Sequence, residues 1–168
     1  MSDVRIVSYE ARHLAGIRDL IVPIQRNEFG FSITYEDQKD LHDIPGFYQR
    51  AGGEFWVALD AADVVGSIAL VDIGNGQGAL RKMFVKQPYR GAPHRLAARL
   101  LARLLEHAAE RGIDDIYLGT TEKFRAAHRF YEKSGFQRVE EPDLPARFPR
   151  MNVDTRFYRL RARPVRTA

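Results

Sequence analysis

Apolar and polar residues alternate along several short stretches of this chain, and a period of two predicts β-strands. The alternation occurs at residues 4–8 and then in three stretches in the middle of the chain, at 54–59, 64–73 and 79–86. Turn-forming residues separate the middle three, with Ala-Ala-Asp at 61–63 and Gly-Asn-Gly at 74–76. Two tight turns between three strands predict an antiparallel meander.

Near the N-terminus the apolar residues instead recur every three or four positions, which predicts an amphipathic helix over residues 14–24. Pro23 should end its regular part, because proline has no N–H to donate. Residues 27–31 are expected to form a loop. Thr34, with an acid three residues later, is expected to cap a short helix that starts near Glu36.

A longer helix is predicted over residues 96–110. One face of it is apolar, with Leu96, Leu100, Leu101, Leu104, Leu105 and Ala108. Gly112 should end this helix, and residues 113–120 read as the next strand. Strands 79–86 and 113–120, joined by a helix, are therefore expected to form a right-handed parallel crossover.

The C-terminal part continues the same succession of elements. A second helix should end near Gly135, a strand should follow at 136–139, and a final strand is expected after the proline-rich connection 142–149. Its alternating residues are Val153, Thr155, Phe157 and Leu160. The predicted fold class is α/β, a mixed and mostly antiparallel sheet with helices on both faces, in a single domain over residues 1–168.

Composition excludes several kinds of chemistry. The chain has 168 residues, 45% of them hydrophobic, and no cysteine, so disulfides, thiolate metal sites and a cysteine nucleophile are excluded. No metal is expected, because the histidines lack metal-ligand spacing. They are His13, His42, His94, His107 and His128. Without an apolar signal region or an apolar run of about 18 residues, we expect a soluble, cytoplasmic protein that does not associate with membranes.

The net charge of +4, from 26 basic and 22 acidic side chains, is too small to indicate nucleic-acid binding. The C-terminal end is nevertheless locally basic. Its arginines are Arg147, Arg150, Arg156, Arg159, Arg161, Arg163 and Arg166. We interpret them as a solvated strand face and a tail, because a charge run usually has no more specific role.

A cationic turn precedes the long helix and reads Arg-Gly-Ala-Pro-His-Arg at residues 90–95. The start of a helix leaves backbone N–H groups without partners and carries the positive end of the helix dipole. A strand that enters a glycine-containing turn and then a helix therefore predicts a phosphate site.

The segment Phe-Tyr-Glu-Lys-Ser-Gly-Phe at residues 130–136 places a phenol near the end of the second predicted helix. Gly135 is expected to close that helix in a left-handed cap. The hydroxyl of Tyr131 would then face a bound group and give up a proton to it. Tyr131 is the candidate catalytic acid, and a half-buried aromatic in the core is the alternative.

Together, residues 79–139 resemble the GNAT superfamily of N-acetyltransferases: a strand, the Arg-Gly turn, a helix, a strand, and a helix that ends in Phe-Tyr-Glu-Lys-x-Gly-Phe. The resemblance implies that acetyl-CoA is the acyl donor, with its diphosphate on the turn and its pantetheine against the strand before it. It implies that Tyr131 protonates the departing thiolate. The implied cofactor-binding residues are Met83, Phe84, Val85, Arg90, Gly91, Ala92, Pro93, His94, Arg95, Leu96, Ala97, Phe124, Ala127, His128 and Tyr131.

The turn departs from the family pattern in two ways. It is one residue longer, and Arg95 stands where a second glycine is usual. Pro93 removes one backbone donor. Our hypothesis is that Arg90, Arg95 and His94 replace it with charge-assisted hydrogen bonds to phosphate.

The residue that would deprotonate the amine is also changed. Many members of the family carry a glutamate close to the position of Ala79, which cannot accept a proton. Glu54, Asp72 and Glu122 are the remaining candidates for the base, and solvated carboxylates at strand ends are the alternative reading of each. Phe124 stands where the family often has an asparagine, so an apolar contact with pantetheine is expected there. For His128 a surface position is the alternative to contact with the cofactor.

The resemblance implies direct transfer of the acetyl group to a primary amine in a ternary complex. The backbone around residues 83–85 would hold the oxyanion. The alternative function is a non-catalytic acyl-CoA sensor or an interaction module of the same fold. The acceptor is expected to contact residues 26–48 and 140–150, and its identity stays open, as does a homodimer.

Overall fold

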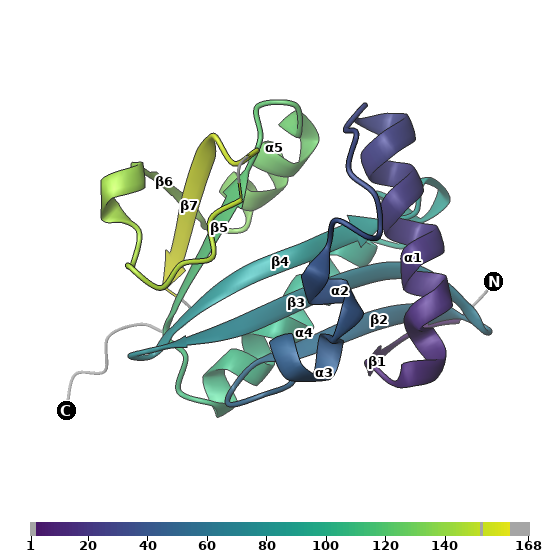
Figure 1. The fold of residues 1–168 in the computed structure, drawn as a ribbon, viewed down its shortest axis with the longest axis horizontal. Helices are drawn as coiled ribbons and strands as arrows, with labels where there is room; N and C mark the ends of the chain where they lie inside the picture. Colours follow the sequence, from purple (N-terminus) through teal and green to yellow (C-terminus); the bar gives the residue numbers. More distant parts are fainter. Residues whose placement is uncertain (1–2, 152, 162–168) are drawn as a thin grey trace.

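The protein, described here from a computed structural model, is built on a seven-stranded mixed sheet with helices on both faces (Figure 1). The structure describes residues 3–151 and 153–161; Arg163 and Arg166 lie outside them. The strands are β1 (Val4–Ser8), β2 (Glu54–Asp60), β3 (Asp63–Gly74), β4 (Gln77–Val85), β5 (Asp115–Thr120), β6 (Gln137–Val139) and β7 (Arg156–Arg161). The main helices are α1 (Leu14–Pro23), α2 (Lys39–His42), α3 (Ile44–Phe47), α4 (Leu96–Glu110) and α5 (Arg125–Lys133).

The strand order is β1-β2-β3-β4-β5-β7-β6. Strands β1 to β4 pair antiparallel in succession, β4 and β5 pair in parallel across helix α4, and β7 pairs antiparallel with both β5 and β6. The predicted meander, the parallel crossover and the mostly antiparallel mixed sheet are therefore all present.

The alternation along β2 explains why both faces of the sheet are covered. Phe55, Val57 and Leu59 pack in one apolar cluster with α1, α2 and α3, which lie on one face (Figure 1). Trp56 and Ala58 point the other way, into a second cluster with the leucines of α4 and with Tyr131. Two apolar layers separated by one sheet follow directly from the period of two.

Several boundaries differ from the sequence-based expectations. The regular N-terminal α-helix ends at Pro23, as the sequence predicts, but a π-helical turn, Ile24–Glu28, follows it and takes the place of the first part of the loop expected at residues 27–31. Thr34 and Asp37 do exchange the expected hydrogen bonds, yet they close a turn, and α2 begins only at Lys39. The final strand begins at Arg156 rather than near 153.

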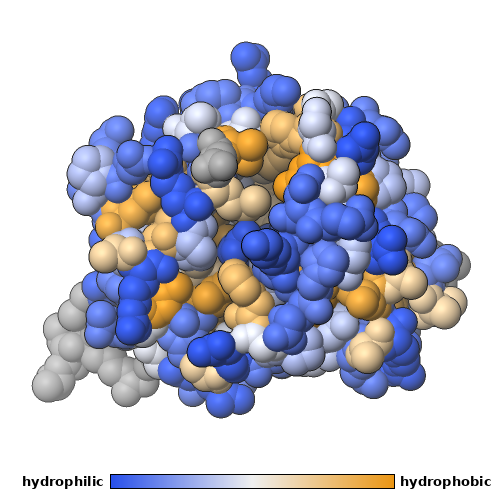
Figure 2. Space-filling view, viewed as in Figure 1, coloured by the Kyte–Doolittle hydropathy of each residue, from blue (hydrophilic) through white to orange (hydrophobic). Residues whose placement is uncertain are grey.

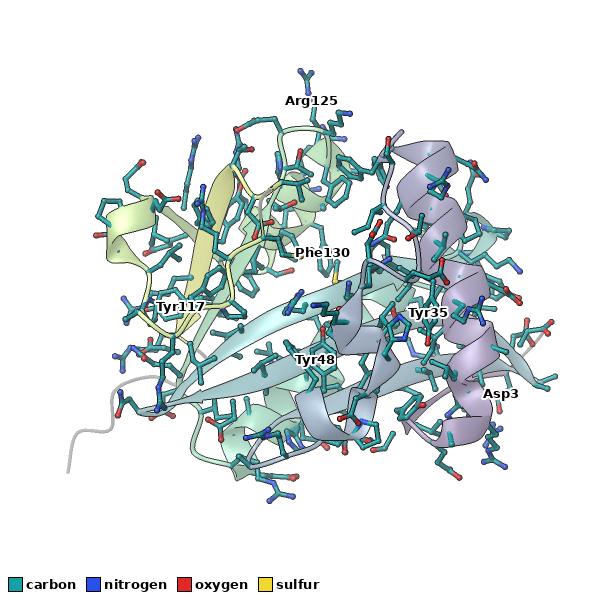
Figure 3. The ribbon with its side chains drawn as sticks, viewed as in Figure 1. Asp3, Tyr35, Tyr48, Tyr117, Arg125 and Phe130 are labelled. Atoms are coloured by element: carbon teal, nitrogen blue, oxygen red, sulfur yellow. The ribbon has the colours of Figure 1, made fainter. Side chains whose placement is uncertain are left out.

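Apolar residues reach the surface in several separate places on one face of the molecule. Figure 2 shows them in orange, with hydrophilic residues in blue between and around them. Figure 3 places Tyr48 near α2 and α3 and Phe130 on α5, with β4 running between them. Within the described ranges, no helix has the length and apolar character that crossing a membrane requires.

Candidate active site

Strands β4 and β5 are paired only at their first residues. The parallel register runs from Gln77 opposite Asp115 to Ala79 opposite Tyr117 and ends there. Beyond that point, a bulge in β4 inserts an extra residue opposite β3, with Lys82 at a φ of 53°. The hydroxyl of Ser67 holds the bulge by donating to the Lys82 carbonyl at 2.7 Å. The two strands therefore separate and open a cleft in the middle of the sheet.

The walls of this cleft come from parts of the chain that are far apart in sequence. The lining residues are Leu80 to Phe84 of β4, Leu118 to Thr121 at the end of β5, Phe124, Ala127 and Tyr131 of the α5 region, Gln25, Phe31 and Ile33, and Phe148, Pro149, Met151, Val153 and Asp154. Of the last two groups, Phe31, Ile33, Phe148 and Pro149 belong to the segments that were expected to meet the acceptor, and the others lie just outside them. The structure thus brings Met83, Phe84, Phe124, Ala127 and Tyr131 to one cleft.

Tyr131 lies on α5 and is almost completely buried, 6% exposed. Its ring packs against Phe136 and Tyr158, with centroids 5.5 and 6.0 Å away. None of the described residues forms a hydrogen bond with its hydroxyl. Burial raises the pKa of Tyr131, with a smaller contribution from Tyr158. The phenol therefore keeps its proton, and within the described part of the chain it has no hydrogen-bond partner.

Gly135 fixes the end of the helix that carries Tyr131. Its φ of 99° is a conformation that a side chain disfavours, and it lets the N–H of Phe136 turn back to the Tyr131 carbonyl at 3.0 Å. The predicted left-handed cap is confirmed. It holds Tyr131 and Phe136 against each other beside the cleft.

The cationic turn follows β4 and starts α4 without a side-chain cap. Arg95 is the N-cap residue, in the left-handed conformation at φ 48°, and its N–H bonds the Gly91 carbonyl at 2.7 Å. The helix's own hydrogen bonds begin when the Arg99 N–H reaches the Arg95 carbonyl at 3.2 Å. The preceding N–H groups of the first helical turn therefore stay available to an anion, as the sequence predicts.

Arg90, at the start of the turn, is not free. Its Nε donates to the Val85 carbonyl at 2.7 Å, and its two terminal nitrogens contact the two carboxylate oxygens of Glu28 at 2.8 and 3.0 Å. The ring of His94 lies 4.9 Å from that of Tyr89. Glu28 of the π-helical turn thus occupies the guanidinium that was expected to meet phosphate.

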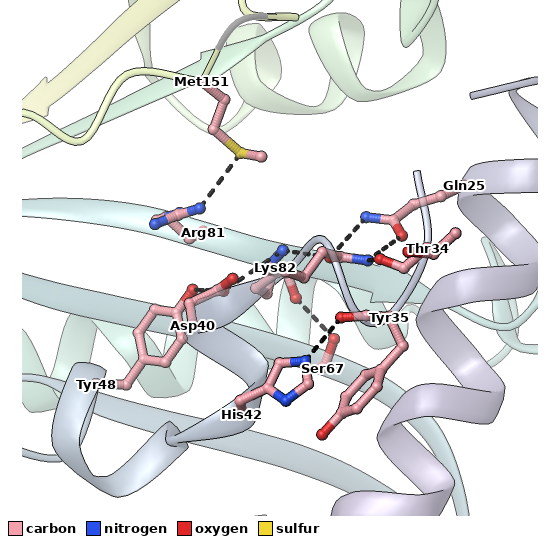
Figure 4. A network of polar contacts seen from close by, with 11 residues as sticks. Gln25, Thr34, Tyr35, Asp40, His42, Tyr48, Ser67, Arg81, Lys82 and Met151 are labelled. Carbon is pink, nitrogen blue, oxygen red and sulfur yellow. Dashed lines mark hydrogen bonds and ion pairs between the residues drawn. The ribbon is translucent and has the colours of Figure 1, made fainter. Parts of the chain in front are cut away.

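Lys82 is the centre of a buried polar network under the cleft (Figure 4). Its Nζ donates to Gln38 Oε1 at 2.7 Å and lies 3.5 Å from Asp40 Oδ2, which also accepts from the Tyr48 hydroxyl at 2.5 Å. Gln38 is held in turn by Gln25. Burial lowers the pKa of Lys82 to about 8, against the opposing effect of Asp40. In the sequence, the feature that could have pointed to this network is the pair Arg81-Lys82 inside an otherwise apolar strand.

Asp154 is a buried carboxylate on the cleft wall. Its Oδ2 accepts from the Met151 N–H at 3.0 Å. It lies so close to β5 that a Cβ on Gly119 would come within 2.5 Å of Oδ2, which explains the glycine there. Burial raises the pKa of Asp154, while the Met151 hydrogen bond and nearby arginines oppose the shift. Sequence reasoning missed this residue because a lone acid in a loop carries no local signal.

The comparison with protein families identifies the family of this chain. The model of the Acetyltransferase (GNAT) family matches residues 17–136, well over half of the chain. The chain belongs to the GNAT acetyltransferase family. This membership confirms the resemblance seen in the sequence.

Solved structures of GNAT acetyltransferases have the same architecture. A family member from Staphylococcus aureus Mu50 is 37% identical with a TM-score of 0.91, covering 96% of this chain and 100% of that one. The PaiA N-acetyltransferase of Thermoplasma acidophilum, solved with coenzyme A, shares the fold at 14% identity with a TM-score of 0.75, covering 95% of this chain and 99% of that one. These likenesses confirm the predicted fold class.

Curated GNAT relatives are longer than this chain. N-acetylaspartate synthetase from Danio rerio is 34% identical over 127 residues, which are 73% of this chain and 44% of the relative. N-acetyltransferase family 8 member 2 from Rattus norvegicus is 33% identical over 107 residues, 61% of this chain and 46% of the relative. The chain spans less than half the length of these relatives.

In this GNAT domain the three carboxylates considered as bases lie away from the cleft lining. Glu54 accepts from Gln49 at 2.6 Å, and Asp72 accepts from the Gly52 N–H at 2.8 Å. Glu122 is paired with Arg156 at 3.1 Å. Local hydrogen bonds and ion pairs therefore account for each of them.

Phe124 and His128 of the same GNAT segment have different environments. Phe124 lines the cleft, and its ring packs at a tilt against that of Phe29, with centroids 4.2 Å apart. His128 is buried behind it, with Nε2 2.8 Å from the Thr121 carbonyl and Nδ1 3.1 Å from an Arg156 nitrogen. This arrangement assigns the ring hydrogen to Nε2. His128 is thus neither on the surface nor in the cleft lining.

Proposed function

We propose that this chain is an acetyl-CoA-dependent N-acetyltransferase that passes the acetyl group directly to a primary amine in a ternary complex. The observation that carries the proposal is the cleft between the separated ends of β4 and β5, with Tyr131 in its wall. The fold that this chain shares with enzymes solved with coenzyme A supports the choice of donor. Amine acetylation is also what the names of its relatives describe.

The donor half of the proposed site consists of the turn at residues 90–95, the first turn of α4 and the free edge of β4. The uncapped N–H groups at the start of α4 would bind the diphosphate. Met83 and Phe84, past the end of the β4–β5 pairing, would lie along the pantetheine. Arg95 is exposed beside the turn and would add charge-assisted contacts.

The chemistry needs one proton to leave the amine and one to reach the sulfur. The amine nitrogen attacks the thioester carbonyl, a backbone N–H of residues 83–85 holds the oxyanion, and the carbon–sulfur bond breaks. Tyr131 donates its proton to the departing thiolate. Because burial raises the pKa of Tyr131, the phenol is protonated at neutral pH and recovers its proton from solvent after each cycle.

The acceptor half consists of Arg81, Lys82, Thr120 and Asp154, all in the cleft lining. Asp154 is the proposed base, because it lies in the cleft lining and because burial raises its pKa, which makes the carboxylate a better proton acceptor. This assignment replaces Glu54, Asp72 and Glu122, whose carboxylates are used elsewhere.

The test combines binding with turnover. Isothermal titration with acetyl-CoA should give one-to-one binding, and release of thiol should follow when an amine library is added. Tyr131→Phe should lower kcat by about a hundredfold to ten-thousandfold and leave the Kd for acetyl-CoA nearly unchanged. Tyr117→Phe is the matched control, since Tyr117 is a buried tyrosine of β5 outside the cleft lining.

Each other outcome has a definite meaning. Full turnover in Tyr131→Phe would remove Tyr131 from the mechanism. Binding of acetyl-CoA without thiol release from any amine would favour the acyl-CoA sensor. Absence of acetyl-CoA binding would contradict the donor assignment.

A further inference from the structure

Arg81 is a half-buried cation, and most of its N–H donors have no strong hydrogen-bond acceptor. One terminal nitrogen lies 3.3 Å from the thioether sulfur of Met151, and the guanidinium carbon lies 5.3 Å from the Phe47 ring centroid. The structured part of the chain places no carboxylate within 4.0 Å of it. A guanidinium has five N–H donors, and a sulfur and a ring are weak partners for them.

The other arginines that reach inward differ from Arg81 in this respect. Within the described residues the other half-buried arginines are Arg103, Arg156 and Arg159, and they are paired with Glu106, Glu122 and Asp115 at 3.3, 3.1 and 2.7 Å. Such pairing is expected, because a partly buried charge is costly unless an opposite charge meets it. Arg81 therefore stands out among the half-buried arginines of the described residues, because it forms no ion pair within 4.0 Å and interacts with the Asp154 carboxyl only at longer range.

Thr120 gives a second, independent indication of a ligand. It lies at the end of β5 in the same cleft lining, it is 5% exposed, and its Oγ1 has no hydrogen-bond partner among the described residues. A buried hydroxyl without a partner is unfavourable by itself. A ligand oxygen in the cleft would satisfy it.

The neighbouring charges define what kind of ligand fits. Lys82 adds a positive charge next to Arg81, but Gln38 and Asp40 already occupy its Nζ (Figure 4). Asp154 lies in the same lining and can receive a cationic amine. The remaining wall is apolar, with Phe31, Ile33 and Phe148 among its residues. Two cations beside one carboxylate suit a ligand that carries both an amine and an anion.

From these contacts we infer that the acceptor is an amine that also carries a carboxylate, as an amino acid does, and that Arg81 binds this carboxylate with Thr120 donating to it. The inference rests on the proposed function. The amine then lies toward Asp154 and the side chain against the apolar wall. A polyamine is disfavoured, because Arg81 and Lys82 would repel its second charge.

The experiment compares acceptors that differ only in the carboxylate. Each amino acid and its carboxamide are offered with acetyl-CoA, and kcat/KM is measured by thiol release. The wild-type chain should prefer the acid by about tenfold to a hundredfold, the usual effect of one hydrogen-bonded charged pair. Arg81→Gln should lower kcat/KM for the acid and leave the amide nearly unchanged, so that the preference is lost.

Two variants separate recognition from damage to the fold. Arg81→Lys keeps the charge but not the planar fork, so its preference for the acid should be intermediate. Arg147→Gln removes an arginine that bonds the Ile73 carbonyl outside the cleft lining, and its preference should equal that of the wild type. Melting temperatures of all variants check that they fold.

Three results would overturn the inference: equal use of acids and amides by the wild type, an equal loss on both in Arg81→Gln, or acetylation confined to amines without a carboxylate. Each of these leaves the proposed function standing. Acetyl-CoA binding without acetylation of any amine would instead defeat the proposed function, and the inference with it.

Discussion

At the donor half of the proposed site the protein offers mostly backbone, whereas at the acceptor half it offers side chains. The turn at residues 90–95 is largely exposed, and its expected ligand contacts are the N–H groups at the start of α4. The acceptor half brings Arg81, Lys82, Thr120 and Asp154 together on buried or half-buried positions of β4, β5 and the segment before β7.

This difference indicates where specificity lies. Backbone donors at a helix start bind phosphate whatever the surrounding side chains are, so a turn with Pro93 and Arg95 can still hold the donor. The acceptor half depends on the identity of each side chain. We therefore expect single substitutions to change catalysis and acceptor choice strongly at the acceptor half, and donor affinity modestly at the donor half.

The largest expected effect follows the replacement of the proposed base. Asp154→Asn keeps an oxygen for the Met151 N–H but cannot take a proton, so kcat should fall by about a hundredfold to ten-thousandfold. Asp143→Asn is the matched control, because Asp143 also accepts a backbone N–H three residues before it, at 3.0 Å, outside the cleft lining. Unchanged turnover in Asp154→Asn would show that another group or water removes the proton.

The pH dependence of the same variant separates catalysis from folding. Because burial raises the pKa of Asp154 in the folded state, wild-type turnover should fall as the pH drops through that pKa. The carboxyl's contribution to stability is fully present below the unfolded pKa of about 3.9 and is lost as the pH rises through the folded pKa. At pH 7 the melting temperature of Asp154→Asn should therefore equal or exceed that of the wild type. Any difference between the two melting temperatures should be smaller at pH 4.

A smaller effect is expected at the donor half. Arg95→Glu should raise the KM for acetyl-CoA by about tenfold and leave kcat nearly unchanged, because it replaces a favourable phosphate contact with repulsion. The effect should shrink as salt is added. Arg138→Glu, an exposed arginine of β6, controls for the change in net charge. An unchanged KM would mean that the backbone alone compensates for Pro93.

Local signals account for what the sequence predicts well. The cap at Gly135, the uncapped start of α4 and the parallel crossover each depend on a short stretch of chain, so motif and periodicity were enough to predict them. The same holds for Tyr131, which the cap places beside the cleft. These local elements frame the donor half of the proposed site, whose contacts with acetyl-CoA stay a prediction.

The acceptor half of the proposed site could not be predicted from local sequence signals. Lys82 bonds Gln38, which is 44 residues away in the sequence, and the guanidinium of Arg81 contacts Met151, which is 70 residues away. The bulge and the separation of β4 from β5 create these contacts, and neither has a local signature. His128 shows the same limit: its carbonyl and arginine partners bury a residue that was expected either on the surface or in contact with the cofactor.

The smallest predicted effect concerns the contact between Glu28 and Arg90. Bound donor and Glu28 compete for one guanidinium, and both side chains of the pair are well exposed, 40% and 36%. An exposed ion pair contributes only about 0–1 kcal/mol, so Glu28→Gln should lower the Kd for acetyl-CoA by at most about fivefold. Titration calorimetry measures the change, and Glu36→Gln removes the same charge from a nearby exposed position as the control. Weaker binding in Glu28→Gln would mean that Glu28 orients Arg90 toward the donor rather than competing with it.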